Sequence, residues 1–493
     1  MSFSLLTFSI FLPIAFGAAI FWGRFDQKMR EIICMCVVCL TSAAVLFCVF
    51  RGQAETVSLF NLTAKIAIAF KVDGISRIFA LLLAVLWPLA SLWSFEYMYH
   101  ESRPNVFFGY YTATYGITLG IAFSANLITM YLFYELLTLI TIPLIMHSRN
   151  EFSKPAGIKY IAYSIAGETA AFVGIMIFYS LSGTVDYTEG GIAMRVLALG
   201  ESNPLYYLAF ILMFFGFGVK AAVFPLYEWL PSVGVAPTPV TALLHAVAVV
   251  KSGCFAIIRI TYYAFGVYLL RGTWVQALAL VFVSFTIAFG SIWANRETHF
   301  KRRLAMSTVS NLSYILLGAM TMTATGLLGG LMHMLFHGVM KITLFFTAGT
   351  CHVQAHADYV TDLKGFGKKM PITFAAYTVA SLALVGVPPL CGFYSKYILG
   401  VAAVQEAGFD WFAYLGVAAL LISAIYTAFY LLSIVVNAYF PGKDFDYETI
   451  AEVKEPSWKM CIPFIILAIL CLGCGIFYRP IMNFVMICMG GLF

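Results

Sequence analysis

Nine ionisable side chains of this sequence stand inside long apolar segments. A charged residue at the centre of a membrane helix costs roughly 2.5 to 3.5 kcal/mol, so such residues face the protein interior or a wet cavity and usually mark ion or proton pathways. Basic groups predominate here, which strengthens the prediction of a pathway. The residues are Glu135, Glu168, Lys220, His245, Lys251, His333, His337, Lys341 and Lys396.

Glu135 and Lys220 have opposite charges and lie in different segments, so each can offset the desolvation of the other. At roughly 4 Å and an effective dielectric constant of about 20, their attraction is about 4 kcal/mol. The charge on a buried lysine depends on whether a carboxylate is near, so a small movement of the partner would release or capture a proton. The alternative is a static pair that fixes helix register.

A second group of basic side chains repeats every four residues, as His333, His337 and Lys341. His352 follows Lys341 by eleven residues, so on an α-helix all four fall within roughly 100° of one another, and His356 extends the stripe. Because the segment leads into a basic loop, we predict a proton path from the membrane centre to the cytoplasm. Helix packing is one alternative. A metal site is another, although no third ligand is evident.

Glu168 is a carboxyl group in the sixth apolar segment. It would either ionise beside a cation such as Lys220 or Lys251, or stay protonated. We predict the first, because cations are in excess and an unpaired buried lysine is costly.

Several other functions are disfavoured. Gly216, Gly218 and Ala221 match a GxGxxA pattern, but no strand precedes them, so a dinucleotide site is not expected. No Walker motif is present, and the cysteines lack the spacing of an iron–sulfur or haem site. Basic and aromatic residues do not interleave on a soluble surface, so nucleic-acid binding is not expected. The sequence thus predicts a pathway without cofactor, metal or energy source of its own.

Apolar helices must position these residues. Of 493 residues, 62% are hydrophobic and 11% charged, against about 25% charged in a soluble domain. Windows of about 20 apolar residues recur about fourteen times, from 4–22 to 461–478. The first lacks the flanks of a cleaved signal and is expected to remain as a helix. The sequence predicts an all-α polytopic membrane protein.

Two apolar segments are interrupted by Pro and Gly. One holds Lys220 before Pro225, and the other, "LVGVPPLCGFYSKYILG", holds Lys396. Broken helices at corresponding positions of two halves are typical of inverted-repeat transporters. We expect this division of the chain: N-terminal helices 1–3 in 1–104, a first inverted repeat of helices 4–8 in 105–266, a second of helices 9–13 in 272–439, and a C-terminal loop and helix 14 in 440–493.

Lys and Arg concentrate in the odd-numbered loops, as with Arg24, Arg103, Arg149, Lys301 and Lys364, whereas the even-numbered loops hold few. By the positive-inside rule the odd-numbered loops are cytoplasmic. We therefore expect a multi-pass protein of the cell's inner membrane with both termini outside the cytoplasm.

Five motifs resemble the antiporter-like membrane subunits shared by respiratory complex I, Mrp-type sodium/proton antiporters and membrane-bound hydrogenases. They are "FYELL" at 133–137, "GFGVKAAVFPLYEWLPSVGVAPTPVTALLHAVAVVKSG" at 216–253, "LAMSTVSNLSYI" at 304–315, "HMLFHGVMKITLF" at 333–345 and "GVPPLCGFYSK" at 386–396. Together they cover most of residues 105–400. The resemblance implies fourteen helices, two inverted five-helix repeats with broken helices, and a central Glu/Lys axis that carries protons between half-channels.

The resemblance also implies individual roles. Glu135 would be the gating carboxylate, Lys220 the central lysine of the first half, Lys251 the connecting lysine and Lys396 the terminal lysine of the second half. Two positions depart from the family pattern. Tyr227 stands where the family often has histidine, and Glu168 has no counterpart in the shared pattern.

The function implied is a non-redox, proton-translocating subunit of a multi-subunit membrane complex in the lipid bilayer. Partner subunits, including homologous antiporter-like ones, would drive it, as in a complex I-like enzyme or a membrane-bound hydrogenase. Lys251 after "LLHAVAVV" and lysine at 396 resemble the Mrp D-type branch and its hydrogenase-associated relatives, so the alternative is a D-type subunit that exchanges sodium for protons. A self-sufficient cation/proton antiporter and a membrane scaffold for redox subunits are further hypotheses.

Overall fold

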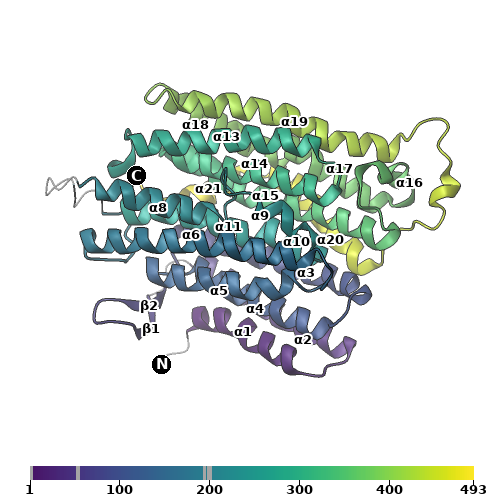
Figure 1. Ribbon diagram of the computed structural model, residues 1–493, viewed down its shortest axis with the longest axis horizontal. Coiled ribbons are helices and arrows are strands. Elements are labelled where there is room, and N and C mark those ends of the chain that lie inside the picture. Colours follow the sequence, from purple (N-terminus) through teal and green to yellow (C-terminus); the bar gives the residue numbers. More distant parts are fainter. Residues whose placement is uncertain (1–3, 52–55, 193–195, 197–202) are drawn as a thin grey trace.

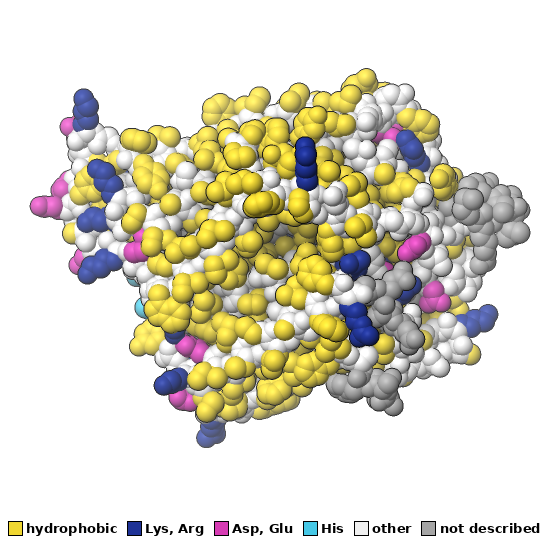
Figure 2. Space-filling model, turned by 180° about the vertical axis from the view of Figure 1, so that it is seen from behind, with side chains coloured by type: hydrophobic (Ala, Val, Ile, Leu, Met, Phe, Trp, Pro, Cys, Tyr) yellow, Lys and Arg dark blue, Asp and Glu magenta, His cyan; other side chains and the backbone are white. Residues whose placement is uncertain are grey.

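The computed structural model describes residues 4–51, 56–192, 196 and 203–493. Most of these residues are helical, and the helices run roughly along the longest axis of the molecule (Figure 1). Among the described residues, ten helices are long and apolar enough to cross a membrane, and Leu205–Gly218 and Pro371–Val385 are shorter apolar helices. A broad hydrophobic band lies between two ends where most charged side chains gather (Figure 2). The chain is therefore a multi-pass membrane protein, as the composition predicted.

The N-terminal helices form one side of the bundle. α1 (Leu5–Trp22) packs along α4 (Pro104–Ala122), and α2 (Gln27–Arg51) packs against α1 and α3 (Gly74–Tyr97), which the short η1 (Met98–His100) follows. Pro104 at the first turn of α4 suits that position because its missing N–H would have no helical partner there.

A short hairpin lies between α2 and α3, so the expectation of an all-α chain is wrong in this detail. Strands β1 (Val57–Asn61) and β2 (Ala67–Phe70) pair antiparallel, with a register irregularity between Ser58 and Phe60. The Ala69 carbonyl accepts a hydrogen bond from the Ala125 N–H, which ties the hairpin to the segment after α4. These strands are much shorter than the apolar membrane segments, so a search for windows of about 20 apolar residues does not detect them.

The first interruption follows α5 (Leu127–Ile145), α6 (Ser153–Ser182) and α8 (Leu205–Gly218). Residues 219–228 are turns, and the chain resumes through short helical pieces before the next long helical segment. These pieces are α9 (Trp229–Ser232), η2 (Val233–Val235), α10 (Thr238–Ala242), the π-helix η3 (Leu243–Val247), α11 (Val249–Arg259), the π-helix η4 (Ile260–Phe265) and α12 (Val267–Leu270).

The second interruption, at residues 386–390, separates α17 (Pro371–Val385) from α18 (Cys391–Ala407). Gly386 has a φ of 99°, which a residue with a side chain rarely adopts, and this helps to end α17. The remaining elements of this half are α13 (Trp274–Arg296), α14 (Phe300–Met320), α15 (Ala324–Ala355), η5 (Val360–Leu363), α16 (Phe366–Lys369), α19 (Ala413–Tyr439), η6 (Tyr447–Ile450), α20 (Trp458–Ile476) and α21 (Tyr478–Cys488).

The segment 238–265 and helix α15 are buried along almost their whole length. A helix that is apolar all round and fully enclosed belongs to the core of a large bundle. α15 contacts α3, α14, α17 and α18, so it lies at the centre of the molecule. Most polar side chains on these two segments, including Lys251, His337 and Lys341, are therefore enclosed by protein.

A buried ion pair joins the N-terminal helices to this centre. The guanidinium of Arg259 on α11 donates two hydrogen bonds to the carboxylate of Asp73, at 2.6 and 2.9 Å. Asp73 also caps α3 by accepting from the Ser76 N–H at 3.0 Å. The rings of Tyr187 and Tyr263 lie 5.0 and 4.5 Å from the guanidinium carbon. This two-bond geometry fixes both distance and orientation.

We predict that Asp73→Asn destabilises the protein, because Asn retains the helix cap but leaves Arg259 as an unpaired buried charge. Breaking such a pair costs about 3 to 5 kcal/mol. Unfolding of the purified chain by SDS titration in mixed micelles measures the loss. Asp444→Asn removes an equal charge at an exposed position and should leave the curve unchanged. A midpoint for Asp73→Asn equal to that of the control would contradict the prediction.

Candidate functional site

Lys220 lies in the turns that interrupt the first broken helix, directly after α8. Its ammonium donates to the Tyr134 carbonyl at 2.6 Å and lies 3.5 Å from the centre of the Tyr134 ring. The residue is 1% exposed. The accepting carbonyl belongs to the neighbouring helix α5, so a contact between helices helps the fold to accommodate this lysine.

The carboxylate that pairs with Lys220 is Glu168 on α6, at 2.7 Å between Nζ and Oε1. The prediction that Glu168 lies beside a cation is confirmed. The predicted Glu135–Lys220 ion pair is not found. Glu135 is only half-buried and accepts a hydrogen bond from the Tyr131 hydroxyl on its own helix. Thr138, one turn further along α5, donates to Glu168 instead.

Two glycines explain why Glu168 reaches Lys220. A Cβ added to Gly167 would come within 2.7 Å of the Gly216 carbonyl oxygen, and a Cβ on Gly216 within 2.6 Å of the Gly167 carbonyl oxygen. Small residues of this kind let membrane helices approach closely. Glu135 lies on α5. The sequence separation from Lys220 does not indicate whether the carboxylate of α5 or that of α6 reaches the interruption.

A second cluster lies on α11 and α15. The ammonium of Lys251 is 3.3 Å from Nδ1 of His337 and donates to the Ala246 carbonyl, which belongs to the π-helix η3. π-helical turns inside helices are frequent at functional sites because they change the backbone hydrogen bonding locally. His333 stacks on His337 with ring centres 5.8 Å apart. Both histidines are fully buried.

His333 continues the cluster toward α14 and α18. Its Nδ1 lies 3.0 Å from the Ser395 hydroxyl and its Nε2 lies 3.3 Å from the Asn311 side-chain oxygen. Ser395 is the residue before Lys396, whose ammonium donates to the Leu384 carbonyl at 2.5 Å. Both ring nitrogens of His333 are thus engaged within the protein, which disfavours a metal-binding role. Among the described residues, no group of three His, Cys, Asp or Glu side chains is placed to hold a metal ion.

Lys341 and His245 are the two remaining predicted residues, and both lie near this cluster. Lys341 donates to the Leu304 carbonyl at 2.8 Å and to the Ser307 hydroxyl. His245, in the π-helix η3, stacks on Phe345 at 4.7 Å, and both of its ring nitrogens lack a protein hydrogen-bond partner. Within the described chain, Lys251, Lys341 and Lys396 have no carboxylate at ion-pair distance.

Lys341 and His352 lie on the same helix α15, but their polar contacts are separate. His352 is about one-third exposed and pairs with Asp358 at 2.9 Å, while His356 lies beyond the helix end with a φ of 51°. No hydrogen bond among the described residues connects Lys341 to His352. Helical spacing places these residues on one face of α15, but α14 packs beside Lys341, and Lys341 therefore donates to Leu304 and Ser307 of that helix.

Ser307, Asn311 and Ser395 are contacts that the sequence analysis did not single out. Ser307 and Asn311 fall inside the motif "LAMSTVSNLSYI", where spacing of four places both on one face of α14. The buried Arg259 was also missed, although it stands in an apolar helix. Its signal was the same as for the lysines, a charge within an apolar segment.

The arrangement gathers titratable and hydroxyl groups from several helices, some of them joined by hydrogen bonds and His333 and His337 by ring stacking. Glu168 and Lys220 form one part; Lys251, His337, His333 and Lys396 form another. The two parts are close, because a Cβ on Gly253 would lie 2.4 Å from the Ala221 N and 2.8 Å from the Lys220 carbonyl carbon. Such groups can accept and pass protons.

Two curated proteins illustrate the sequence relatives of this chain. The chain is 32% identical over 325 residues to "NADH-quinone oxidoreductase subunit N" of Desulforudis audaxviator (strain MP104C), covering 66% of this chain and 63% of that protein. It is 29% identical over 439 residues to "Putative antiporter subunit mnhA2" of Staphylococcus aureus (strain USA300 / TCH1516), covering 83% of this chain and 52% of that protein. The chain thus spans between half and two thirds of the length of these curated relatives.

Solved structures share the fold. A chain of an archaeal respiratory complex, the membrane-bound sulfane sulfur reductase, superposes with a TM-score of 0.84 at 24% identity, covering 99% of this chain and 98% of that one. A chain of the Mrp complex from Dietzia sp. DQ12-45-1b gives 0.85 at 20% identity, covering 100% and 98%.

Residues 124–423 match the family described as NADH:quinone oxidoreductase/Mrp antiporter, TM. That range contains every predicted site residue from Glu135 to Lys396 and both helix interruptions. The chain therefore belongs to the NADH:quinone oxidoreductase/Mrp antiporter transmembrane family.

Proposed function

We propose that this chain moves protons across the membrane as an antiporter-like subunit of a larger complex. The observation that carries the proposal is the buried polar axis, in which Glu168 and Lys220 lie beside the Lys251–His337–His333–Lys396 cluster. Each group lies within the apolar bundle, where ionisable side chains are expensive and usually functional. Family membership supports the same reading.

Protons would enter and leave by two half-channels that meet at the axis. His245, with two ring nitrogens lacking a protein partner, and Nε2 of His337 mark places where water would complete a path between the fixed groups. Fourteen helices, with inverted five-helix repeats in 105–266 and 272–439, fit the two interruptions at residues 219–228 and 386–390. In this arrangement both termini lie outside the cytoplasm.

Partner subunits would supply the energy. Moving one proton against roughly 200 mV costs about 4.6 kcal/mol, and the sequence carries no cofactor or nucleotide motif. The relatives are named as subunits of a quinone oxidoreductase and of an antiporter, and the structural neighbours come from multi-subunit membrane complexes. A redox-driven complex is the main proposal. An Mrp-type sodium/proton antiporter is the alternative, favoured by the S. aureus relative.

Everted vesicles distinguish these possibilities. We expect the chain expressed alone to show little proton movement, and the chain with its native partner subunits to show proton uptake on addition of a reductant. Uptake that instead requires a sodium gradient would establish the Mrp alternative. Strong cation-dependent exchange by the chain alone would contradict the need for partners. Normal pumping by a complex that lacks this chain would show that the chain is not the proton pathway.

We predict that Glu168→Gln and Lys220→Gln each lower proton translocation at least tenfold, because each leaves its partner as an unpaired buried group. The double variant with both changes should recover the yield of folded complex, since it buries no lone charge, but it should not recover translocation.

Glu228→Gln is the matched control for these variants. Glu228 follows the same helix interruption but is exposed and pairs with Lys159 at 2.9 Å. It should translocate normally, because exposed pairs contribute little. Translocation by the double variant at the rate of this control would refute the assignment of Glu168 and Lys220.

A further prediction concerns His337. His337→Gln keeps hydrogen-bonding capacity but cannot take up a proton near neutral pH, so turnover should fall about tenfold or more while assembly stays intact. His356→Gln, at the exposed end of the same helix, is the control and should behave as wild type. Initial rates of proton uptake measure both. Equal rates in the two variants would show that His337 only packs, and inhibition of wild type by chelators would favour a metal site instead.

A further inference from the structure

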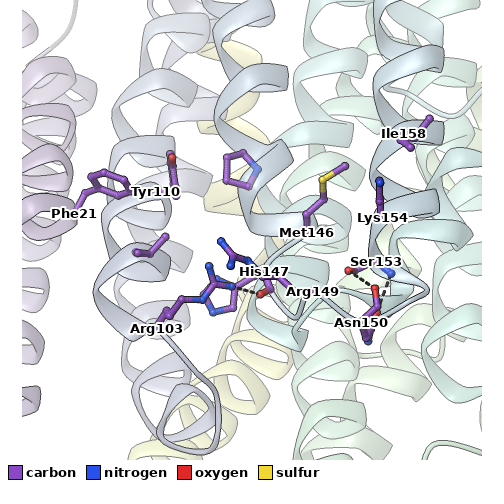
Figure 3. A pocket seen from close by; sticks show the side chains of 12 residues that line it. Phe21, Arg103, Tyr110, Met146, His147, Arg149, Asn150, Ser153, Lys154 and Ile158 are labelled. Carbon is purple, nitrogen blue, oxygen red and sulfur yellow. Dashed lines mark hydrogen bonds between the residues drawn. The ribbon is translucent and has the colours of Figure 1, made fainter.

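A cavity of about 620 Å³ lies apart from the polar axis, at one end of α1, α4, α5 and α6 (Figure 3). α1 packs on α4, α4 on α5 and α5 on α6, so that the cavity has Phe21 of α1 on one side and Ile158 of α6 on the other. Its volume falls within the range of small-molecule sites, about 300 to 1,000 Å³. The cavity is therefore large enough for a lipid headgroup.

The charge of the cavity is positive. Arg103, Arg149 and Lys154 line it, and none of its described lining residues is Asp or Glu. Arg103 donates to the His147 carbonyl at 2.7 Å, which fixes that side chain. Arg149 and Lys154 form no ion pair with any described residue. Glu151 lines an adjoining hollow that shares Arg149 and Lys154 with the cavity.

Polar and apolar side chains separate within the cavity. Figure 3 shows Arg103, His147 and Arg149 at one end, with Phe21 and Tyr110 displaced along the helices toward the other. Met146 and Ile158 add further apolar surface, and Lys154 lies on the Ile158 side as a cation on a long apolar stem. α6 also begins beside the cavity, at Ser153, so its N-terminal N–H groups add positive potential. The site thus offers charge at one end and hydrocarbon contact at the other.

Exposed aromatic residues indicate the depth of this end of the molecule in the membrane. Trp22 is the last residue of α1 and is 77% exposed, and Tyr99, between α3 and α4, is 67% exposed. Both helix ends lie on the same side of the bundle as the loops that hold Arg103 and Arg149. Trp and Tyr collect where the hydrocarbon meets the headgroups. The cavity therefore lies at headgroup depth.

We propose that this cavity binds an anionic phospholipid, with its phosphate between Arg149 and Lys154 and its glycerol and upper acyl chain against Tyr110 and Ile158. Basic pockets between transmembrane helices are suited to anionic headgroups. A free phosphate ion would use the cations but leave the apolar half uncovered. A bound lipid would bridge α1 and α6, which border the cavity from opposite sides.

Native mass spectrometry of the purified full-length chain, titrated with phosphatidylglycerol, tests the site. Arg149→Gln/Lys154→Gln should bind about 30-fold more weakly than wild type, which corresponds to about 2 kcal/mol at roughly 1 kcal/mol per basic residue. Lys364→Gln/Lys443→Gln removes two exposed charges from other basic loops and should bind as wild type. Phosphatidylcholine should bind to all three proteins weakly and equally.

Four outcomes overturn the assignment. The first is equal phosphatidylglycerol binding by the Arg149/Lys154 variant and its control, and the second is equal binding of phosphatidylcholine and phosphatidylglycerol by wild type. The third is displacement of the lipid by millimolar inorganic phosphate, which would show a simple anion site. In the fourth, the Arg149/Lys154 variant keeps its lipid but loses partner subunits on purification of the complex, which would assign the cavity to an acidic segment of a partner protein.

Discussion

The buried pair of Lys220 and Glu168 is the constraint on which the centre of this protein depends. The ammonium of Lys220, in the middle of the bundle, contacts the Glu168 carboxylate and the Tyr134 carbonyl, and neighbouring helices supply both. Lys220 lies in the interruption at residues 219–228, and α6 approaches within contact distance and brings Glu168 to it. Gly167 and Gly216 make that approach possible. Charge, backbone break and helix packing therefore form one unit.

The other lysines of the axis are accommodated differently. Each donates to a main-chain carbonyl, Lys251 to Ala246, Lys341 to Leu304 and Lys396 to Leu384. Carbonyls are available because a π-helix and a second helix interruption lie nearby, or because a neighbouring helix is close. A carbonyl offers less compensation than a carboxylate, and cations so close together repel one another.

Ion pairs at one end of the bundle hold the helices around this axis. Arg259 is bound through two hydrogen bonds to Asp73. Arg271 binds Glu406 at 2.7 Å, and the Gln276 amide donates to the same carboxylate at 3.2 Å. Asp73 directly precedes α3, Arg259 ends α11, and Glu406 is near the end of α18, so the partners come from different parts of the chain. They tie the N-terminal helices and α18 to the centre of the bundle.

The sequence by itself determined which residue types enter the membrane and where the helices break, because both follow from local composition. An ionisable residue in an apolar segment and a Pro/Gly cluster can be read without a fold, and they identified Lys220, Lys251, His337 and Lys396 in advance. Only the tertiary structure decided the pairing. Two glycines let α6 bring Glu168 to Lys220, whereas α5 presents Tyr134 to the ammonium and Glu135 binds Tyr131 on its own helix; helical spacing cannot reveal how neighbouring helices approach. The same reason explains why Lys341 donates to Ser307 on α14, while no hydrogen bond among the described residues leads on to His352.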